Sequence, residues 1–213
     1  MKIDVKKSIN FENTLPENGE VFYHGCILSS ESAQHYFVKL LSNINWKPDE
    51  VIIFGKRLTT KRCVAWYADK PFIYKYSNIP RQALPWTEEL LALKTLVEYE
   101  SNETYNSCLM NLYHDGLEGM GWHSDDEKEL KPYGAISSLS LGAERRFLFK
   151  NKSSKVIVPI MLASGSLLVM KGITQRHWLH RLPPTTKIKA PRINLTFRTI
   201  MTPESTLNCN NTS

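Results

Sequence analysis

A histidine and an aspartate that lie two positions apart could bind one metal ion. They are His123 and Asp125 in the run Gly-Trp-His-Ser-Asp-Asp-Glu, and in an extended segment alternate side chains point the same way. A single His-x-Asp pair also occurs on ordinary surfaces, so the motif needs a third ligand. The downstream run Arg-His-Trp-Leu-His-Arg offers His177 or His180. Two histidines and one carboxylate form the facial triad of non-haem Fe(II) oxygenases, which leaves metal positions open for a chelating 2-oxo acid and for dioxygen.

A second motif, Arg-Ile-Asn-Leu-Thr-Phe-Arg, could hold the carboxylate of such an acid. Because strand side chains alternate, one face of this segment would be apolar and the other would carry Arg192, Asn194, Thr196 and Arg198. An edge strand with a solvated polar face is the alternative interpretation. A second strand of the same character would add Asn111 and Tyr113. Together these side chains would form a bidentate clamp, with further hydrogen-bonding groups, for a small dicarboxylate.

The hydrophobic pattern predicts the elements that must position these residues. Two amphipathic helices are expected, one from a cap at Ser29 to Ile44 and one from a cap at Thr87 to about Val97. Short β-rich runs follow at 108–113, 135–141, 146–150, 166–170 and 193–200. We therefore expect an α+β fold in which the N-terminal helices cover one sheet of a sandwich or barrel. Residues 1–201 would form a single domain, and residues 202–213 a polar, disordered tail.

Composition excludes several classes of protein. Apolar runs are too short to span a bilayer, and none follows the N-terminal lysines, so we expect no membrane segment and no secretion signal. The four cysteines lack the close spacing of zinc sites and disulfide frameworks. We therefore expect an intracellular protein, cytoplasmic in a bacterium or nuclear in a eukaryote. We also expect it to be a monomer. The formal charge of +6 suits a polyanionic partner.

The run from Tyr105 to Glu129 and the closing Pro-Arg-Ile-Asn-Leu-Thr-Phe-Arg resemble the AlkB family of nucleic-acid dealkylating dioxygenases. The likeness extends over about residues 51–201 and points to the branch that acts on double-stranded DNA. It implies a double-stranded β-helix, or jelly roll, as the core of the fold. It also implies oxidative demethylation of alkylated bases in DNA, with release of succinate, CO2 and formaldehyde. Lesions that weaken base pairing, such as 1-methyladenine and 3-methylcytosine, would be favoured because they cost least to flip.

The same resemblance assigns the cofactor and the co-substrates, which are Fe(II), 2-oxoglutarate and O2. The iron ligands would be His123, Asp125 and His180, the last being the second histidine of the His-Trp-x-His run. The residues that contact 2-oxoglutarate would be Asn111, Tyr113, Arg192, Asn194, Thr196 and Arg198.

A segment at about residues 51–80 is expected to recognise the nucleotide. Phe54, Gly55 and Lys56 are followed by further cations. The functional interpretation is a finger whose ring enters the base stack while the cations hold phosphates. Family members that act on duplexes carry an aromatic residue at the corresponding place. A hairpin with a solvated basic edge is the alternative.

Two further features could contact an extruded base. Tyr74 and Tyr76 share one face of a predicted strand, and Tyr76 could stack on the base in front of His123. A tyrosine pair packed in a sheet is the alternative. Asp126 would lie at the rim of the pocket, where a carboxylate suits a cationic methylated base, or else in a turn.

Other functions compete with DNA demethylation. The same chemistry could act on RNA or on a protein side chain, and the chain could be a nucleic-acid-binding module with a vestigial pocket. A sugar-binding or storage jelly roll would show no dependence on iron. The joint presence of His123, Asp125, His180, Arg192 and Arg198 argues against a pure binding module.

Overall fold

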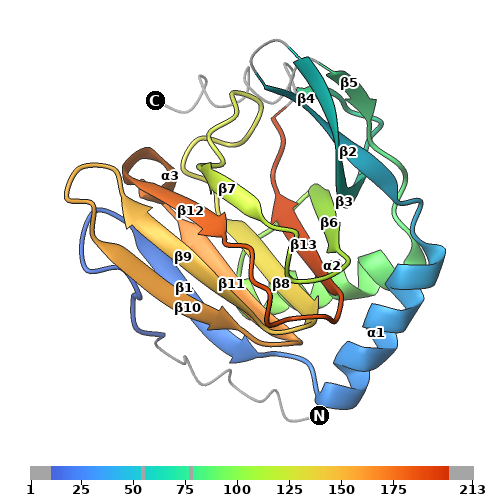
Figure 1. The fold of residues 1–213 in the computed structure, drawn as a ribbon, viewed down its shortest axis with the longest axis horizontal. Coiled ribbons are helices and arrows are strands. Elements are labelled where there is room, and N and C mark those ends of the chain that lie inside the picture. Colours follow the sequence, from blue (N-terminus) through green and yellow to red (C-terminus); the bar gives the residue numbers. More distant parts are fainter. Residues whose placement is uncertain (1–10, 54–55, 77–78, 202–213) are drawn as a thin grey trace, which may run out of the picture.

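The computed structural model describes residues 11–53, 56–76 and 79–201, with side chains at 51–58 and 73–81 left out (Figure 1). Within that part, two antiparallel sheets face each other. The larger has the order β1 (Glu20–Cys26), β11 (Ser166–Lys171), β8 (Ile136–Gly142), β13 (Arg192–Arg198), β6 (Ser107–Tyr113), β3 (Lys56–Ala68), β2 (Lys47–Ile53). The smaller has the order β10 (Ile157–Leu162), β9 (Arg145–Asn151), β12 (Trp178–Leu182), β7 (Met120–His123). A separate hairpin joins β4 (Ile73–Tyr76) to β5 (Ile79–Gln82).

Both long helices cover the outer face of the larger sheet, as the sequence predicted. Helix α1 (Ser30–Asn43) begins after Ser29, whose side chain accepts a hydrogen bond from the Ser32 N–H, and α2 (Glu88–Ser101) begins after Thr87 in the same way. Their apolar stripes are buried in one core with the outer face of the sheet. The short helix α3 (Thr174–His177) lies next to β12. None of the helices in the described residues is long and apolar enough to cross a membrane.

Strand β13 carries the predicted division between apolar and polar faces. Ile193, Leu195 and Phe197 are fully buried in the core beneath the helices. The strand pairs with β6 on one side and β8 on the other, so the alternative of an edge strand is wrong. Its polar face is therefore enclosed between the two sheets instead of being solvated.

Several elements differ from the sequence prediction. Strands β1, β7, β10 and β12 were not predicted, because each is short or has its pattern interrupted. Strand β1, for example, changes register between Tyr23 and Gly25, where Gly25 has a φ of 68°. Strand β13 ends at Arg198, and Ile200 instead forms an isolated bridge with Leu130.

The predicted hairpin near residue 54 is present in the backbone. Strands β2 and β3 pair antiparallel up to Ile53 and Lys56. The residues between them, Phe54 and Gly55, lie outside the described part of the chain, as does the predicted tail at 202–213.

Candidate metal and co-substrate site

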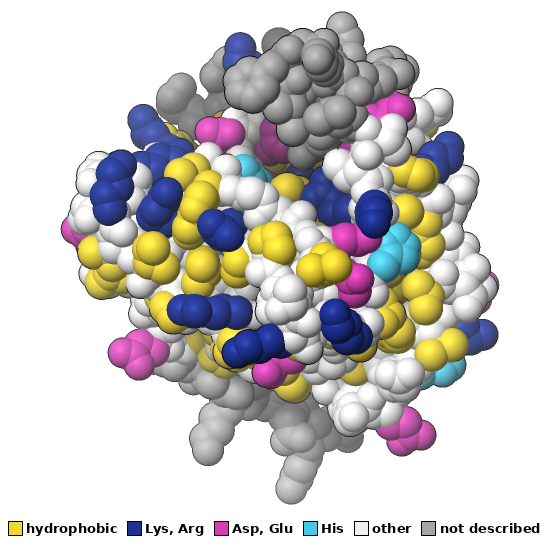
Figure 2. Space-filling view, in the orientation of Figure 1, with side chains coloured by type: hydrophobic (Ala, Val, Ile, Leu, Met, Phe, Trp, Pro, Cys, Tyr) yellow, Lys and Arg dark blue, Asp and Glu magenta, His cyan; other side chains and the backbone are white. Residues whose placement is uncertain are grey.

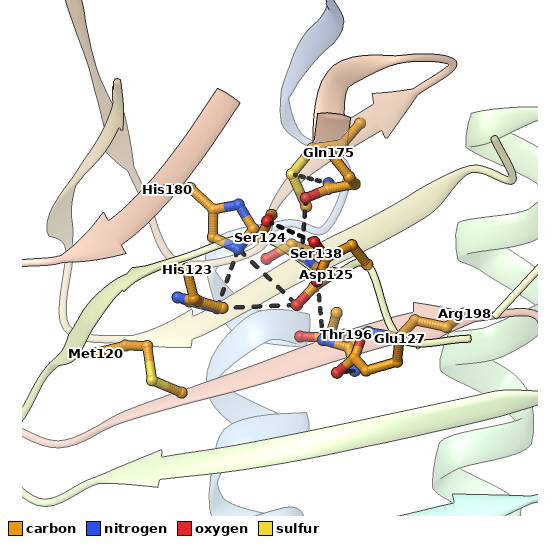
Figure 3. A network of polar contacts seen from close by, with 12 residues as sticks. Met120, His123, Ser124, Asp125, Glu127, Ser138, Gln175, His180, Thr196 and Arg198 are labelled. Atoms are coloured by element: carbon orange, nitrogen blue, oxygen red, sulfur yellow. Dashed lines mark hydrogen bonds and ion pairs between the residues drawn. The ribbon is translucent and has the colours of Figure 1, made fainter. Parts of the chain in front are cut away.

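The three predicted iron ligands meet at the inner face of the smaller sheet. His123 on β7 and His180 on β12 are direct partners across the two strands, and Asp125 lies in the loop that follows β7. The two Nε2 atoms are 3.1 Å apart, and Asp125 Oδ1 lies 3.8 Å from His123 Nε2 and 4.0 Å from His180 Nε2 (Figure 3). One ligand atom from each residue lies within 4.8 Å of the other two. The fold thus assembles a His-Asp-His triad from two separate motifs, and His177 takes no part in it.

The surroundings hold His180 and Asp125 in the protonation states that bind metal. Burial lowers the pKa of His180 to about 3, outweighing the nearby Asp125 carboxylate, so its imidazole is neutral. Burial alone would raise the pKa of Asp125, but the charge and hydrogen bond of the neighbouring Arg198 guanidinium lower it overall, so the carboxylate is ionised. His123 Nδ1 lies 2.9 Å from the Gly121 carbonyl. A bond donated there leaves a lone pair on Nε2, directed toward the other two ligands. Two imidazoles and one carboxylate converging in this way fit Fe(II).

All six residues predicted to contact 2-oxoglutarate line the same cavity as the triad. They are Asn111, Tyr113, Arg192, Asn194, Thr196 and Arg198. The register brings them together, because Tyr113 pairs with Arg192 and Asn111 with Asn194 across β6 and β13. Phe147 closes the cavity near the triad, with its ring 5.5 Å from that of His180.

Arg192 forms a cationic end of this cavity. Its side chain is only 2% exposed, its Nη2 donates to Ser140 Oγ at 2.9 Å and to Asn194 Oδ1 at 2.7 Å, and its guanidinium lies 5.6 Å from the centre of the Tyr113 ring. The buried Nε finds no hydrogen-bond partner among the described residues. Burial lowers the pKa of Arg192 to about 10. A buried cation with a free donor fits the carboxylate of a small acid.

Arg198 lies at the other end of the same polar face, next to the triad. Its Nη2 is 2.8 Å from Asp125 Oδ2, and its Nη1 is 3.9 Å from Glu127 Oε1. The structure therefore gives the two arginines different surroundings: Arg198 pairs with a candidate metal ligand, whereas no carboxylate of the described residues forms an ion pair with Arg192.

Some residues of the cavity were missed by the sequence reasoning. Ser138 lines it and donates to Asn194 Oδ1 at 2.9 Å, while Ser140 accepts from Arg192. Both serines lie on one face of β8, so the alternation that identified β13 could have identified them too. Phe147 and Met120 carried no comparable signal, because only the pairing of the strands brings them to the site.

A second hollow adjoins the cavity and shares Leu109, Asn111, Met120, Glu127 and Arg198 with it. Its remaining walls are mainly apolar and are formed by Val64, Trp66, Leu130 and Ile200. They also contain the hydroxyl of Ser107, the carboxylate of Glu129 and an ion pair between the buried residues Arg62 and Asp49. A flat apolar ring with a positive charge would suit this mixture of apolar wall and carboxylates.

The predicted substrate-facing residues are placed only in part. Phe54 and Gly55 lie outside the described residues, and for Lys56, Tyr74 and Tyr76 only the strand positions on β3 and β4 are described. The sixth, Asp126, is exposed and accepts a hydrogen bond from Ser124 Oγ at 3.3 Å. It borders a neighbouring depression rather than the cavity. Glu127, which was not singled out, is the carboxylate that reaches both the cavity and the second hollow.

Lysine and arginine side chains gather over the outer face of the smaller sheet, where Figure 2 shows more dark blue than magenta. Arg146 on this face is exposed. Lys150 and Arg181 lie over the ring of Trp122, at 4.5 Å and 5.2 Å from its centre. This basic face agrees with the polyanionic partner suggested by the net charge.

Comparison with known proteins agrees with this fold and site. Residues 19–198 match the 2OG-Fe(II) oxygenase superfamily, to which the chain therefore belongs. Within that superfamily it is a member of the AlkB family. It is 37% identical over 179 residues to human DNA oxidative demethylase ALKBH2, and the alignment covers 80% of this chain and 66% of that one. The corresponding values for mouse ALKBH2 are 36%, 80% and 72%.

Other relatives give the same picture. Bovine alpha-ketoglutarate-dependent dioxygenase alkB homolog 3 is 37% identical, with 80% of this chain and 62% of that protein covered. The chain thus spans about two thirds of the length of the curated relatives it matches. The solved structure of OsALKBH1 superimposes with a TM-score of 0.57 at 14% identity, covering 87% of this chain and 98% of that one. This likeness confirms the predicted jelly-roll core. Family membership implies Fe(II), 2-oxoglutarate and O2 as cofactor and co-substrates.

Proposed function

We propose that this protein oxidatively demethylates alkylated bases, such as 1-methyladenine and 3-methylcytosine, in DNA. The observation that carries the proposal is a single cavity that combines a His-Asp-His triad with a buried arginine, Arg192, which forms no ion pair with a carboxylate of the described residues. The relatives named DNA oxidative demethylase support DNA as the substrate. All of these side chains come from one chain, so the protein can act as a monomer. Work on genomic DNA would place it in the bacterial cytoplasm or the eukaryotic nucleus.

In this proposal His123, Asp125 and His180 hold Fe(II), and the polar face of β13 holds 2-oxoglutarate. Arg198 lies against Asp125 and would meet the keto-acid end near the metal. Arg192 would bind the distant carboxylate, with Tyr113, Asn194 and Thr196 lining the space between. When bound, the iron and the keto acid would supply, together with O2, the oxidation of the N-methyl group: one oxygen atom of O2 would leave in formaldehyde, and the other would enter the succinate that forms from 2-oxoglutarate with release of CO2.

The contribution of the protein is position and exclusion of water. Phe147 and Leu182 line the cavity beside the triad and would keep water from the reacting methyl group. The second hollow, between Trp66 and Glu127, would receive the flipped base, and the carboxylate would favour a cationic lesion. The segment at 51–80 would engage the nucleic acid, with Phe54, Gly55 and Lys56 at the duplex and Tyr74 and Tyr76 near the base. Asp126 would act only at the outer rim.

A turnover assay with several substrates tests the proposal. The protein is loaded with Fe(II) and 2-oxoglutarate without oxygen and mixed with oligonucleotides that carry 1-methyladenine or 3-methylcytosine. Air is then admitted, and demethylation is read as a loss of one methylene unit in the mass spectrum. Single-stranded DNA, duplex DNA and RNA of the same sequence are compared. RNA is the competing substrate, and the resemblance to the duplex-acting branch predicts higher activity on double-stranded DNA than on single strands. Succinate formed without loss of the methyl group from any DNA would contradict the proposal.

A further inference from the structure

Asp125 differs from the two histidines because it lies in a loop rather than on a strand. Arg198 forms an ion pair with the Oδ2 atom of Asp125, and the Oδ1 atom of the same carboxylate therefore faces the two imidazoles. The backbone N–H of Asp125 donates to the side-chain carbonyl of Gln175 at 2.9 Å (Figure 3). The direction in which this carboxylate points therefore depends on the position of Gln175.

Gln175 in turn lies on the single-turn helix α3. A helix of one turn has little stability of its own and must be held by its neighbours. The Gln175 side chain also donates to Met170 Sδ at 3.4 Å. Its backbone carbonyl accepts a hydrogen bond from the ammonium of Lys152 at 2.9 Å. Lys152 is thus one of the groups that fix α3 beside the metal site.

Lys152 connects three segments around Asp125. It follows the end of β9, and its backbone N–H donates to the His177 carbonyl at 2.8 Å. Its ammonium reaches both Gln175 and the hydroxyl of Ser124, the latter at 3.2 Å. Ser124 lies between the two ligands of the His-x-Asp motif. One half-buried cation therefore ties together the end of β9, the helix α3 and the loop that carries Asp125.

We propose that Lys152 and Gln175 are positioning residues that set the affinity of the triad for its metal ion. The inference rests on the proposed role of the triad as iron ligands. Neither residue supplies a triad atom; Gln175 acts through the backbone N–H of Asp125, and Lys152 acts through Gln175 and the hydroxyl of Ser124. Without the ammonium, two acceptors lose their donor, and the loop is free to move away from the histidines. Replacing groups that orient metal ligands weakens metal binding by roughly 10- to 100-fold.

Binding of Co(II) to the metal-free protein tests this, because it requires neither DNA nor turnover. Lys152→Met removes the ammonium but keeps most of the stem, and we expect about tenfold weaker binding in a visible-absorption titration. Lys152→Arg retains a donor and should recover most of the affinity. Lys150→Met is the matched control. It makes the same substitution on the same hairpin, where the ammonium lies over Trp122 instead, and its Co(II) affinity should equal that of the wild type.

The melting temperature of each metal-free variant separates positioning from general loss of fold. We expect it to change little in Lys152→Met while Co(II) affinity falls. Wild-type affinity in Lys152→Met, or equal losses in Lys152→Met and Lys150→Met, would overturn the proposal. Should Lys152→Met not fold, Gln175→Leu removes the acceptor of the Asp125 N–H and must show the same loss, and unchanged affinity there would overturn the proposal equally. Wild-type protein that binds no Co(II) would instead refute the proposed iron site.

Discussion

Replacing Arg192 with methionine should weaken the use of 2-oxoglutarate without unfolding the protein. Losing a charge-assisted bidentate contact costs about 1.5–3 kcal/mol. At about 1.4 kcal/mol per factor of ten, the 2-oxoglutarate concentration for half-maximal rate should rise roughly 10- to 150-fold. Metal affinity should be unchanged, because Arg192 makes no contact with the triad. Arg198→Met should differ by weakening both metal and 2-oxoglutarate binding, since Arg198 pairs with Asp125.

The stability of Arg192→Met follows from the same burial. Burial lowers the pKa of Arg192 from its ordinary value to about 10. At about 1.4 kcal/mol per tenfold change in proton affinity, keeping the charge buried costs roughly 3 kcal/mol. Because the folded pKa lies below the ordinary value, this cost applies at every pH below about 10 and is present at neutral pH. Methionine removes it but also removes the hydrogen bonds to Ser140 and Asn194. The two effects oppose each other, so the free energy of unfolding without co-substrate should change by less than about 1 kcal/mol.

Steady-state turnover at varied 2-oxoglutarate, together with urea unfolding of the metal-free protein, measures both quantities. Arg181→Met is the matched control, since it removes an arginine that lies over Trp122 outside the cavity. A wild-type requirement for 2-oxoglutarate in Arg192→Met would refute the assignment of the co-substrate site. A loss of several kcal/mol in unfolding free energy would refute the argument from the buried charge.

Three further predictions concern single side chains. His180→Ala should abolish turnover and metal binding whereas His177→Ala should retain both in the same assays, and the reverse result would show that the wrong histidine was chosen. Phe54→Ala, which rests on the sequence alone, should lower activity on a methylated duplex about tenfold but leave the single strand nearly unaffected; equal losses on the two would contradict a wedge. Burial raises the pKa of the Cys108 thiol, whereas Cys26 is exposed. A thiol reagent should therefore modify Cys26 in the native protein but Cys108 only after unfolding, as read by mass spectrometry. Rapid labelling of Cys108 in the native state would contradict its burial.

Much of the site could be predicted from the sequence because its motifs are local. The His-x-Asp pair and the alternating segment from Arg192 to Arg198 each need only the geometry of one extended strand. The caps at Ser29 and Thr87 likewise fixed the starts of both long helices. The third ligand needed the family likeness, because nothing in the spacing of His177 and His180 decided between them.

The remaining features depend on contacts between distant segments. Arg198 was expected to bind only the co-substrate, but its ion pair with Asp125 arises from the approach of β13 to the loop after β7. Lys152 and Gln175 are ordinary polar residues in the sequence. They gain a role only where the end of β9 meets α3. Strand β1 could not be predicted from its own pattern, since its only strand partner in the described sheet is β11, over a hundred residues away.

The central claim is that one cavity holds Fe(II) and 2-oxoglutarate together. Titrating 2-oxoglutarate into the Fe(II)-loaded protein without oxygen, and following the visible charge-transfer band of a chelated keto acid, tests it most directly. We expect the band to saturate at one 2-oxoglutarate per chain in the wild type. It should be absent in His180→Ala and should require roughly 10- to 150-fold more 2-oxoglutarate in Arg192→Met. Wild-type protein without the band, or His180→Ala with the full band, would contradict the claim.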